Sequence, residues 1–379
     1  MKSYLLVTGD FVRTGGMDRA NFALADYIAR LEGDVHLVAH RVSKELLAQP
    51  TVTFHSVPKV ANSYLLGAPL LNQTGRFQGW RISKTGGRVL VNGGNCQWGD
   101  CNWVHYVHAA YQPENQAGLL YQLKGSVSRQ IFLNAERKAL QSARVIIANS
   151  DRTKRDLIEK LSIPSERIHK VYYGIDPQVL YPATLSERTQ LRQKLGWSQH
   201  KPIVVFIGAL GDRRKGFDTL FWAWQMLCTD PNWDADLVAI GVGAEQPLWQ
   251  RRALLAGIHK RVHFLGFRSD VPDLLRAADC LVAPTRYEAY GLGVHEALCC
   301  GLPALVSATA GVAERYPVEL GDLLIPNSED AADLAARLRL WRDATQQYSN
   351  LVSELSEELR GYTWDDMAKN ILEKIDSTL

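Results

Sequence analysis

Two glutamates, Glu288 and Glu296, flank a glycine-containing stretch in the segment TRYEAYGLGVHEALCC. The preceding run CLVAP is typical of a buried strand that ends at Pro284, and the residues from Gly293 onward are typical of a helix. We therefore expect Glu288 on a loop and Glu296 in the first turn of a helix, at one edge of a sheet. Carboxylates there accept hydrogen bonds from sugar hydroxyls. The alternative is an ordinary strand–loop–helix crossing whose glutamates face solvent.

Three cations, Arg213, Arg214 and Lys215, follow the apolar run PIVVFIGAL and precede an apparent helix. Cations at the carboxyl end of a strand suit a pyrophosphate and stabilise a leaving phosphate. A charge run is also common on a solvated face, so its position is what favours a site. Cations beside carboxylates fit one ligand that carries a diphosphate between two polyols. Such a ligand is a nucleotide sugar.

Weaker signals lie elsewhere in the sequence. The loop RTGGM contains Gly15 and Gly16 and opens a helix, which would let backbone approach a phosphate, but it lacks the spacing of a dinucleotide fingerprint or P-loop. The segment IGVGAEQ at 240–246 is interpreted as structural. Four potential zinc ligands stand close together in the sequence, but their spacing matches no common zinc site, so we expect no metal there; they are Cys96, Cys101, His105 and His108.

Short apolar runs alternate with helical patterns along the whole chain, which is typical of α/β domains with parallel sheets. Strands are predicted at SYLLVTG, VHLVAH, VTFHSV, RVLVNGG, NWVHYVH and RVIIANS, and again at PIVVFIGAL, DLVAIGVG, RVHFLGF, CLVAPT and PALVSA. Helices are expected at 17–32, 126–142 and 151–162, and a small one at 186–195 in the polar connection between the halves. We therefore expect two doubly wound domains, residues 1–180 and 181–360, and a closing helix at 361–379 that crosses back to the first domain.

The composition bounds the class of protein. The chain has 379 residues, of which 46% are hydrophobic, and a net charge of +3. No apolar run approaches the roughly 20 residues of a membrane-spanning helix, and the first apolar stretch is too short for a signal peptide. The six cysteines are scattered, which suits buried thiols in a reducing compartment. We expect a cytoplasmic protein.

The charge is unevenly distributed. Residues 1–180 contain 22 lysines and arginines against 14 aspartates and glutamates, whereas the remainder contains 21 against 26. Much of the excess lies in ERKALQSARVIIANSDRTKRDLIEK. A solvated helix face explains it, and so does a peripheral contact with anionic lipid at the inner face of a membrane.

The ordered motifs together resemble the retaining glycosyltransferases of family 4. The resemblance rests on GGM near the N-terminus, NSDRTKRDL, RIHKVYYGIDPQVLYP, RRKG, the E-x7-E spacing of Glu288 and Glu296, and the closing helix with Trp364. It covers essentially the whole chain. It implies a GT-B fold, in which two Rossmann-like doubly wound domains face a cleft, the second binding most of the donor and the first the acceptor.

The resemblance also implies a role for individual donor-site residues. Glu296 would hold the ribose hydroxyls and Glu288 those of the transferred sugar. Lys215, with Arg214 beside it, would bind the diphosphate. The remaining donor contacts would be Gly16, which lets the first domain close on the donor, Arg268 near the base, and the backbone around Tyr290, Gly291 and Leu292.

The catalytic residues that the resemblance implies are Lys215, Glu288 and His108, the last of which matches a family histidine near the reaction centre. From the sequence alone, a packed strand histidine is the favoured interpretation of His108, and only the resemblance favours a functional role. Two departures stand out: Ala209 replaces an arginine of the family, and Ala310 replaces a glycine. Because Lys215 and both glutamates are retained, neither departure suggests an inactive enzyme.

Retention without a protein nucleophile is usually drawn as attack on the face that the diphosphate leaves, and the family needs no metal ion. We therefore expect a hexosyltransferase that uses a nucleotide sugar, UDP-glucose as best guess, in surface or exopolysaccharide synthesis. The acceptor would be a glycan or lipid-linked saccharide, with Asn95 and Trp98 among its contacts. The alternatives are a silent subunit that binds nucleotide sugar, and a sugar-nucleotide epimerase of the same fold.

Overall fold

The computed structural model describes residues 2–112, 119–211 and 213–378. The chain divides into two compact units. Among these residues, the first unit contains those up to Gln112, those from Leu119 to Gly174, and those from Thr363 onward. The second unit runs from Ile175 to Tyr362. The chain therefore returns to the first unit for its last helix.

The first unit is built on a parallel sheet whose described strands have the order β5-β3-β1-β6-β7-β8-β9. The order reverses between β1 and β6, as in a doubly wound sheet. A separate short pair joins β2 (Asp10–Phe11) to β4 (Arg41–Val42). The strands of the main sheet are β1 Ser3–Val7, β3 Asp34–Ala39, β5 Val52–Ser56, β6 Arg88–Asn92, β7 Cys101–Val104, β8 Val145–Ala148 and β9 Ile168–Lys170.

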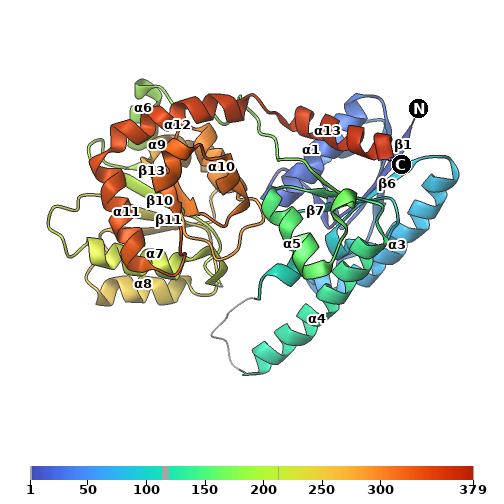
Figure 1. The fold of residues 1–379 in the computed structure, drawn as a ribbon, viewed down its shortest axis with the longest axis horizontal. Coiled ribbons are helices and arrows are strands. Elements are labelled where there is room, and N and C mark those ends of the chain that lie inside the picture. The colour runs from blue at the N-terminus through green and yellow to red at the C-terminus, as the bar shows by residue number, and fades with distance from the viewer. Residues whose placement is uncertain (1, 113–118, 212, 379) are drawn as a thin grey trace. The chain divides into compact units, whose positions relative to one another are not determined.

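Helices cover this sheet, and the last helix of the chain is among them. Figure 1 shows α13 beside α1, although the two stand at opposite ends of the sequence. Trp364, the first residue of α13, lies 6.3 Å from the ring of Tyr173 and under the guanidinium of Arg19. The helices are α1 Gly16–Arg30, α2 Lys44–Leu47, α3 Tyr64–Lys84, α4 Leu119–Ser142, α5 Asp151–Leu161 and α13 Trp364–Thr378, with 3-10 turns η1 Val60–Asn62, η2 Gly93–Asn95, η3 His108–Ala110 and η4 Ser165–Arg167.

The second unit repeats the architecture. Its described strands have the order β12-β11-β10-β13-β14-β15, all parallel, and the order reverses between β10 and β13. The run IVVFI of β10 is apolar throughout because a central parallel strand is covered on both faces. The strands are β10 Ile203–Ile207, β11 Asp236–Ile240, β12 Val262–Gly266, β13 Cys280–Ala283, β14 Ala304–Ser307 and β15 Leu324–Ile325.

The helices of the second unit pack large aromatic side chains against this sheet, among them the fully buried Trp224 and Trp341. The helices are α6 Leu185–Leu195, α7 Phe217–Leu227, α8 Gln246–Leu255, α9 Val271–Ala277, α10 Leu292–Cys299, α11 Ala331–Asp343 and α12 Thr345–Arg360, with 3-10 turns η5 Arg213–Lys215, η6 Gly311–Arg315 and η7 Val318–Leu323.

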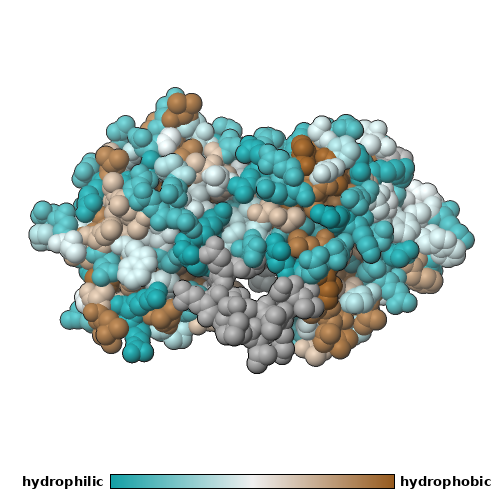
Figure 2. Space-filling model, turned by 60° about the horizontal axis from the view of Figure 1, so that its bottom comes forward, coloured by the Kyte–Doolittle hydropathy of each residue, from teal (hydrophilic) through white to brown (hydrophobic). Residues whose placement is uncertain are grey.

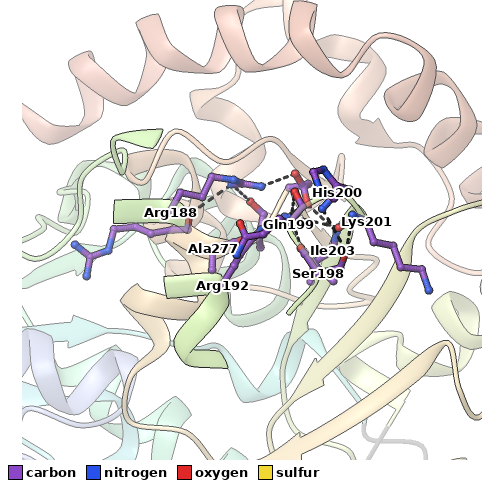
Figure 3. Close-up of polar contacts among 11 residues, drawn as sticks. Arg188, Arg192, Ser198, Gln199, His200, Lys201, Ile203 and Ala277 are labelled. Atoms are coloured by element: carbon purple, nitrogen blue, oxygen red, sulfur yellow. Dashed lines mark hydrogen bonds and ion pairs between the residues drawn. The ribbon is translucent and has the colours of Figure 1, made fainter. Parts of the chain in front are cut away.

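Helix α6, in the connection that the sequence predicts to be polar, is fixed to the sheet by two arginines (Figure 3). The buried Arg192 donates to the carbonyl oxygens of Ala277 at 2.9 Å and Ser198 at 2.9 Å, and it forms an ion pair with Asp279. Arg188 pairs with the other carboxylate oxygen of Asp279 at 2.5 Å. Asp279 also accepts from the backbone amide of Ile203, the first residue of β10, at 2.7 Å. One carboxylate thus joins α6 to the amino end of β10.

Most predicted elements are confirmed, with two corrections near the candidate site. The predicted strand NWVHYVH ends at Val104, because the ring of His105 turns into a buried polar network and the backbone then enters η3. His108 therefore does not stand at the end of a strand. Helix α10 begins at Leu292, so Glu296 is its fifth residue and not part of its first turn. Helix α3 was not predicted.

The surface is largely polar on the face that Figure 2 shows, with small groups of hydrophobic residues between hydrophilic ones. Within the described parts of the chain, no helix combines the length and the apolar character needed to cross a bilayer.

Candidate functional site

Loops after β10 and β13 meet where the strand order of the second sheet reverses. The amide of Arg286 donates to the carbonyl oxygen of Arg214 at 2.8 Å. Gly216 has φ 72° and lies so close to Pro284 that a Cβ on Gly216 would stand 1.8 Å from the carbonyl oxygen of Pro284. Only glycine allows this approach. A ligand crevice at such a reversal is the general rule for doubly wound sheets. The contact brings the basic triplet next to the loop that carries Glu288.

Lys215 and Glu288 form an ion pair between Nζ and Oε2, with side chains that are 21% and 16% exposed. Both line a small pocket of about 40 Å³ that also contains Gly291, Leu292 and Gly293 at the start of α10. The first turn of a helix leaves its N–H groups without carbonyl partners inside the helix. A cation, a carboxylate and helix amides thus converge on one pocket, as the sequence predicts.

The three cations of the triplet do not act as one group. Nε of Arg213 donates to Asp218 at 2.8 Å, and Arg286 donates to both oxygens of the same carboxylate at 2.8 and 2.9 Å. Burial alone would raise the pKa of Asp218, but hydrogen bonds from Arg286 and Arg213 hold it below its usual value. Arg213 is therefore engaged inside the unit, and Lys215 is the member that lines the pocket. Arg286 was missed, although it lies two residues before Glu288.

The segment between the two glutamates is shaped by Gly291, which caps α10 at φ 109°. A Cβ there would meet Val312 Cγ1 at 2.9 Å. The side chain of Tyr290 is buried, and its hydroxyl lies 2.7 Å from Nδ1 of His295. Burial, and then the charge of Arg315, lower the pKa of His295 to about 3, so its ring stays neutral. The side chain of Tyr290 is therefore engaged within the unit, and a ligand contact through its backbone stays a prediction.

Glu296 and Arg268 lie at two further points of this edge. Glu296 is buried on α10, so the two glutamates stand on different elements, as the sequence predicts. Arg268 follows β12 and is paired with Asp270, Nε to Oδ1 at 2.7 Å. The neighbouring Phe267 is exposed and presents an aromatic face that was not predicted from the sequence.

The glycines of IGVGAEQ have a packing role, as interpreted from the sequence. A Cβ at Gly241 would lie 2.0 Å from the carbonyl oxygen of Gly208, and one at Gly243 would lie 2.1 Å from the carbonyl carbon of Leu210. These glycines allow the loop after β11 to lie against the loop after β10. The loop that carries Ala209 and leads to Lys215 is therefore held by its neighbour.

In the first unit, His108 is held by a buried carboxylate. Oε1 of Glu136 on α4 accepts from the backbone amide of His108 at 2.8 Å and lies 3.0 Å from its Nδ1, while Oε2 accepts from the amide of Ala109 at 3.2 Å. Glu136 is fully buried, whereas the His108 ring is 47% exposed. This arrangement places the Nδ1 proton on the side of Glu136 and leaves Nε2 available. Glu136 was missed because it is remote in sequence.

His105, by contrast, belongs to the interior. Its Nδ1 lies 2.5 Å from the hydroxyl of Tyr173 and its Nε2 3.3 Å from Oδ1 of Asn21. Burial lowers its pKa to about 3. Cys96 and Cys101 are buried free thiols, as the sequence predicts. Over the described residues, no group of three or more histidines, cysteines, aspartates or glutamates is arranged to hold a metal ion.

The two residues predicted to contact the acceptor, Asn95 and Trp98, lie in different surroundings. Asn95 ends η2, directly beyond β6, whereas the indole of Trp98 packs on α3, 3.1 Å from where a Cβ of Gly79 would stand. Trp98 lines an open groove whose other walls come from α3. Asn95 is not part of this groove; the lining residues are Asn72, Gln73, Arg76, Phe77, Trp80 and Trp98.

Asp18, in the first turn of α1 after the glycine loop, has a carboxyl group with a raised pKa. Gly15 caps α1 at φ 83° and Gly16 begins the helix. Burial, and next the charge of Asp10, raise the pKa of Asp18 to about 6. Although burial raises the pKa of Asp10, hydrogen bonds from Arg41 and Tyr64 lower it below its usual value, so Asp10 stays charged.

The raised pKa of Asp18 predicts a pH-dependent stability. The folded protein binds this proton more tightly than the unfolded chain, so the free energy of unfolding falls as the pH rises from about 4 to 6. Asp18→Asn has no carboxyl group at this position, so it avoids this fall in the free energy of unfolding. Its Tm should exceed that of the wild type at pH 7.5 and equal it at pH 4, in thermal denaturation at both values. Glu32→Gln, an exposed substitution just beyond the same helix, is the control, and an equal gain at both pH values would contradict the assignment.

Two family models match the chain. Residues 14–179 match the model described as Glycosyltransferase Family 4, and residues 201–343 match the one described as Glycosyl transferases group 1. The chain belongs to the family 4 glycosyltransferases. His108 lies in the first matched segment, and Lys215, Glu288 and Glu296 lie in the second.

Individual relatives are more distant. Alpha-D-kanosaminyltransferase of Streptomyces kanamyceticus is 26% identical over 208 residues, which are 54% of this chain and 53% of that protein. The chain spans about half the length of the curated relatives it matches.

Solved structures of low sequence identity share the whole fold. Sucrose-phosphate synthase from Thermosynechococcus elongatus has a TM-score of 0.79 at 19% identity, over 100% of this chain and 99% of that chain. Anabaena Alr3699/HepE, solved in complex with UDP-glucose, has a TM-score of 0.71 at 19% identity, over 100% of both chains. The fold of this family 4 member is therefore GT-B, as the resemblance implies.

Proposed function

We propose that this family 4 member is a retaining glycosyltransferase that moves a hexose, in the first instance glucose from UDP-glucose, to a glycan or lipid-linked saccharide in surface or exopolysaccharide synthesis. The observation that carries the proposal is the Lys215–Glu288 pair at the strand reversal of the second sheet, with the buried Glu296 on the next helix. The choice of UDP-glucose is supported by its presence in the structurally similar Alr3699/HepE.

The proposed reaction needs few protein groups. An acceptor hydroxyl attacks the anomeric carbon on the face that the diphosphate leaves, through an oxocarbenium-like state. The bond from the anomeric carbon to the diphosphate oxygen breaks as the new glycosidic bond forms, and the acceptor proton passes to a phosphate oxygen. Lys215 and the α10 amides stabilise the charge on the leaving diphosphate, the role that Mg²⁺ fills in other transferases. Glu288 and Glu296 hold the hexose and ribose hydroxyls.

Product analysis tests this proposal against its alternatives. The protein is incubated with UDP-glucose and a panel of saccharide acceptors, and UDP release is followed together with the anomeric configuration of the product by NMR. A transferase releases UDP only when an acceptor is present and gives a product with the donor's configuration. A silent subunit binds donor without turnover, and an epimerase changes the sugar without any acceptor. Either result overturns the proposal.

A pair of variants separates donor binding from acceptor chemistry. Glu296→Ala should weaken UDP binding by about 10- to 100-fold, because it removes hydrogen bonds from ribose hydroxyls to a charged acceptor. His108→Ala should leave the UDP affinity unchanged and lower turnover by about tenfold, the effect of one lost hydrogen bond in the transition state. UDP affinity is measured by calorimetry and turnover by UDP release. Unchanged turnover in His108→Ala would return that residue to a packing role.

A further inference from the structure

Helix α3 presents several large apolar side chains to solvent. Leu66, Leu70, Gln73, Phe77 and Trp80 follow one another at steps of four and three residues, so they form a single stripe along the helix. Apart from the glutamine these are apolar, and all five are exposed, with Phe77 at 57% and Trp80 at 53%. At 1.5 Å per residue the stripe is about 21 Å long. We call Leu66, Leu70, Phe77 and Trp80 the α3 face.

The opposite side of α3, which packs on the sheet, is small. A Cβ at Gly67 would lie 2.7 Å from the ring of His40, and one at Gly75 would lie 2.8 Å from Sγ of Cys96. Three of the five buried residues of α3 are glycines, which bring the helix close to the domain; the other two are Leu71 and Ile82. An ordinary surface helix has the reverse arrangement. An exposed apolar stripe of this extent marks an interaction surface.

The charge around the α3 face has one sign. No aspartate or glutamate occurs between Glu45 and Asp100, a stretch that contains five lysines and arginines. Among the residues that the structure describes, Arg76, Arg81 and Lys84 make no ion pair with a carboxylate. Nζ of Lys84 instead lies 3.6 Å from the ring centre of Trp80. A cationic rim around aromatic and aliphatic side chains complements an anionic surface with an apolar interior.

Part of the charge in the basic segment that the sequence singles out is neutralised within the unit. Arg144 is paired with Asp100 at 2.8 Å, and Arg152 with Asp156 at 3.0 Å. These two cations are therefore engaged within the unit.

We propose that the α3 face docks on the surface of a bilayer containing anionic lipids. The aromatic and leucine side chains enter the headgroup boundary, and Arg76, Arg81 and Lys84 contact lipid phosphates, which is the arrangement of interfacial helices. This places the peripheral membrane contact on α3 rather than on α4 and α5. The contact would bring the enzyme to lipid-linked acceptors, but it does not depend on the donor site, so binding and activity are tested separately.

Vesicle binding of the full chain tests the proposal. Co-sedimentation is measured with phosphatidylcholine vesicles containing about 30% phosphatidylglycerol and with pure phosphatidylcholine vesicles, at low and high salt. We expect binding to the anionic vesicles that weakens with salt. The triple variant Arg76→Gln, Arg81→Gln and Lys84→Gln should bind roughly 100-fold more weakly, given the contribution of each cation near such a surface. Phe77→Ser with Trp80→Ser should weaken binding at least tenfold.

Matched variants elsewhere serve as controls. Arg137→Gln, Lys138→Gln and Arg155→Gln remove the same charge from exposed positions of α4 and α5, and Leu254→Ser with Leu255→Ser removes exposed apolar residues from α8. Both should bind as the wild type does, and circular dichroism checks that all variants are folded. Absence of binding to anionic vesicles, or its loss in the α4–α5 variant alone, would overturn the proposal.

A saccharide is the other ligand that aromatic side chains of this groove could accept. Asn72, Gln73 and Trp98 line the groove beside Trp80. A thermal shift by a soluble oligosaccharide that Trp80→Ser abolishes, without vesicle binding by the wild type, would assign the groove to a glycan and overturn the membrane assignment.

Discussion

Replacing Lys215 by alanine should lower turnover by about 10²- to 10³-fold, the usual loss when one preorganised donor to a developing negative charge is removed. Lys215 is the member of the basic triplet that lines the pocket with Glu288, whereas Arg213 is engaged by Asp218. The negative charge on the diphosphate grows as the anomeric bond breaks. The lysine should therefore matter more in the transition state than in the bound donor, so the KM for UDP-glucose should change much less than kcat.

The Lys215–Glu288 pair adds a second expectation. Without a donor, the lysine and the glutamate neutralise each other. In the proposed reaction, the diphosphate of the donor replaces Glu288 as the partner of Lys215, and the sugar hydroxyls bind Glu288. Lys215→Arg keeps the charge but changes its shape and reach, so it should recover only part of the lost turnover.

Lys201→Ala is a matched control, because Lys201 is also ion-paired, with Asp236 at 2.6 Å, but at the amino end of β11. That variant should keep wild-type turnover, as measured by UDP release under saturating donor. A Lys215→Ala enzyme with full kcat, or one that loses only donor affinity, would show that Lys215 does not act on the leaving group.

The sequence is sufficient to predict the second unit and most of its edge. Parallel strands that are covered on both faces are nearly continuous apolar runs, so IVVFI and CLVA can be recognised without a structure. Their loops could then be placed at the carboxyl edge. The contact between Lys215 and Glu288 follows from the neighbouring positions of β10 and β13, which is the reversal expected of a doubly wound sheet.

The remaining features depend on tertiary contacts. The partner of Arg213 could not be read from the triplet, because it is set by Arg286 and Asp218 from other elements. The strand predicted through His108 ends early because His105 joins a buried polar network with Tyr173, and because the buried Glu136 then binds the backbone of η3.

Helix α3 was missed for a local reason. Its inward side is composed largely of glycines and its outward side is apolar, so the pattern on which helix prediction relies is inverted. Pro69 lies inside the helix. Proline has a low helix propensity, so this residue also disfavours the prediction of a helix. The same inversion is the observation on which the proposed membrane contact of α3 rests.

The largest expected loss of stability comes from Asp279. This carboxylate pairs with both Arg188 and Arg192 and also accepts from the amide of Ile203. Asp279→Ala would leave Arg192, which is 3% exposed, as a buried cation without a counter-charge. Breaking one partner of a buried pair costs about 3–5 kcal/mol in the free energy of unfolding. The measurement is urea denaturation followed by circular dichroism, read as the change in midpoint at constant slope.

An exposed ion pair of the same type provides the comparison. The carboxylate of Asp234 accepts hydrogen bonds from Nε of Arg342 at 2.9 Å and from Nη2 at 2.6 Å, but both side chains are well exposed. Asp234→Ala should therefore cost less than about 1 kcal/mol, since solvent screens such pairs. A loss of similar size in the two variants would mean that burial does not set the strength of the Asp279 contact. Arg192→Met with Asp279→Leu should recover part of the stability, because it removes the buried cation together with the carboxylate and fills the space with apolar groups, while the more exposed Arg188 keeps its charge.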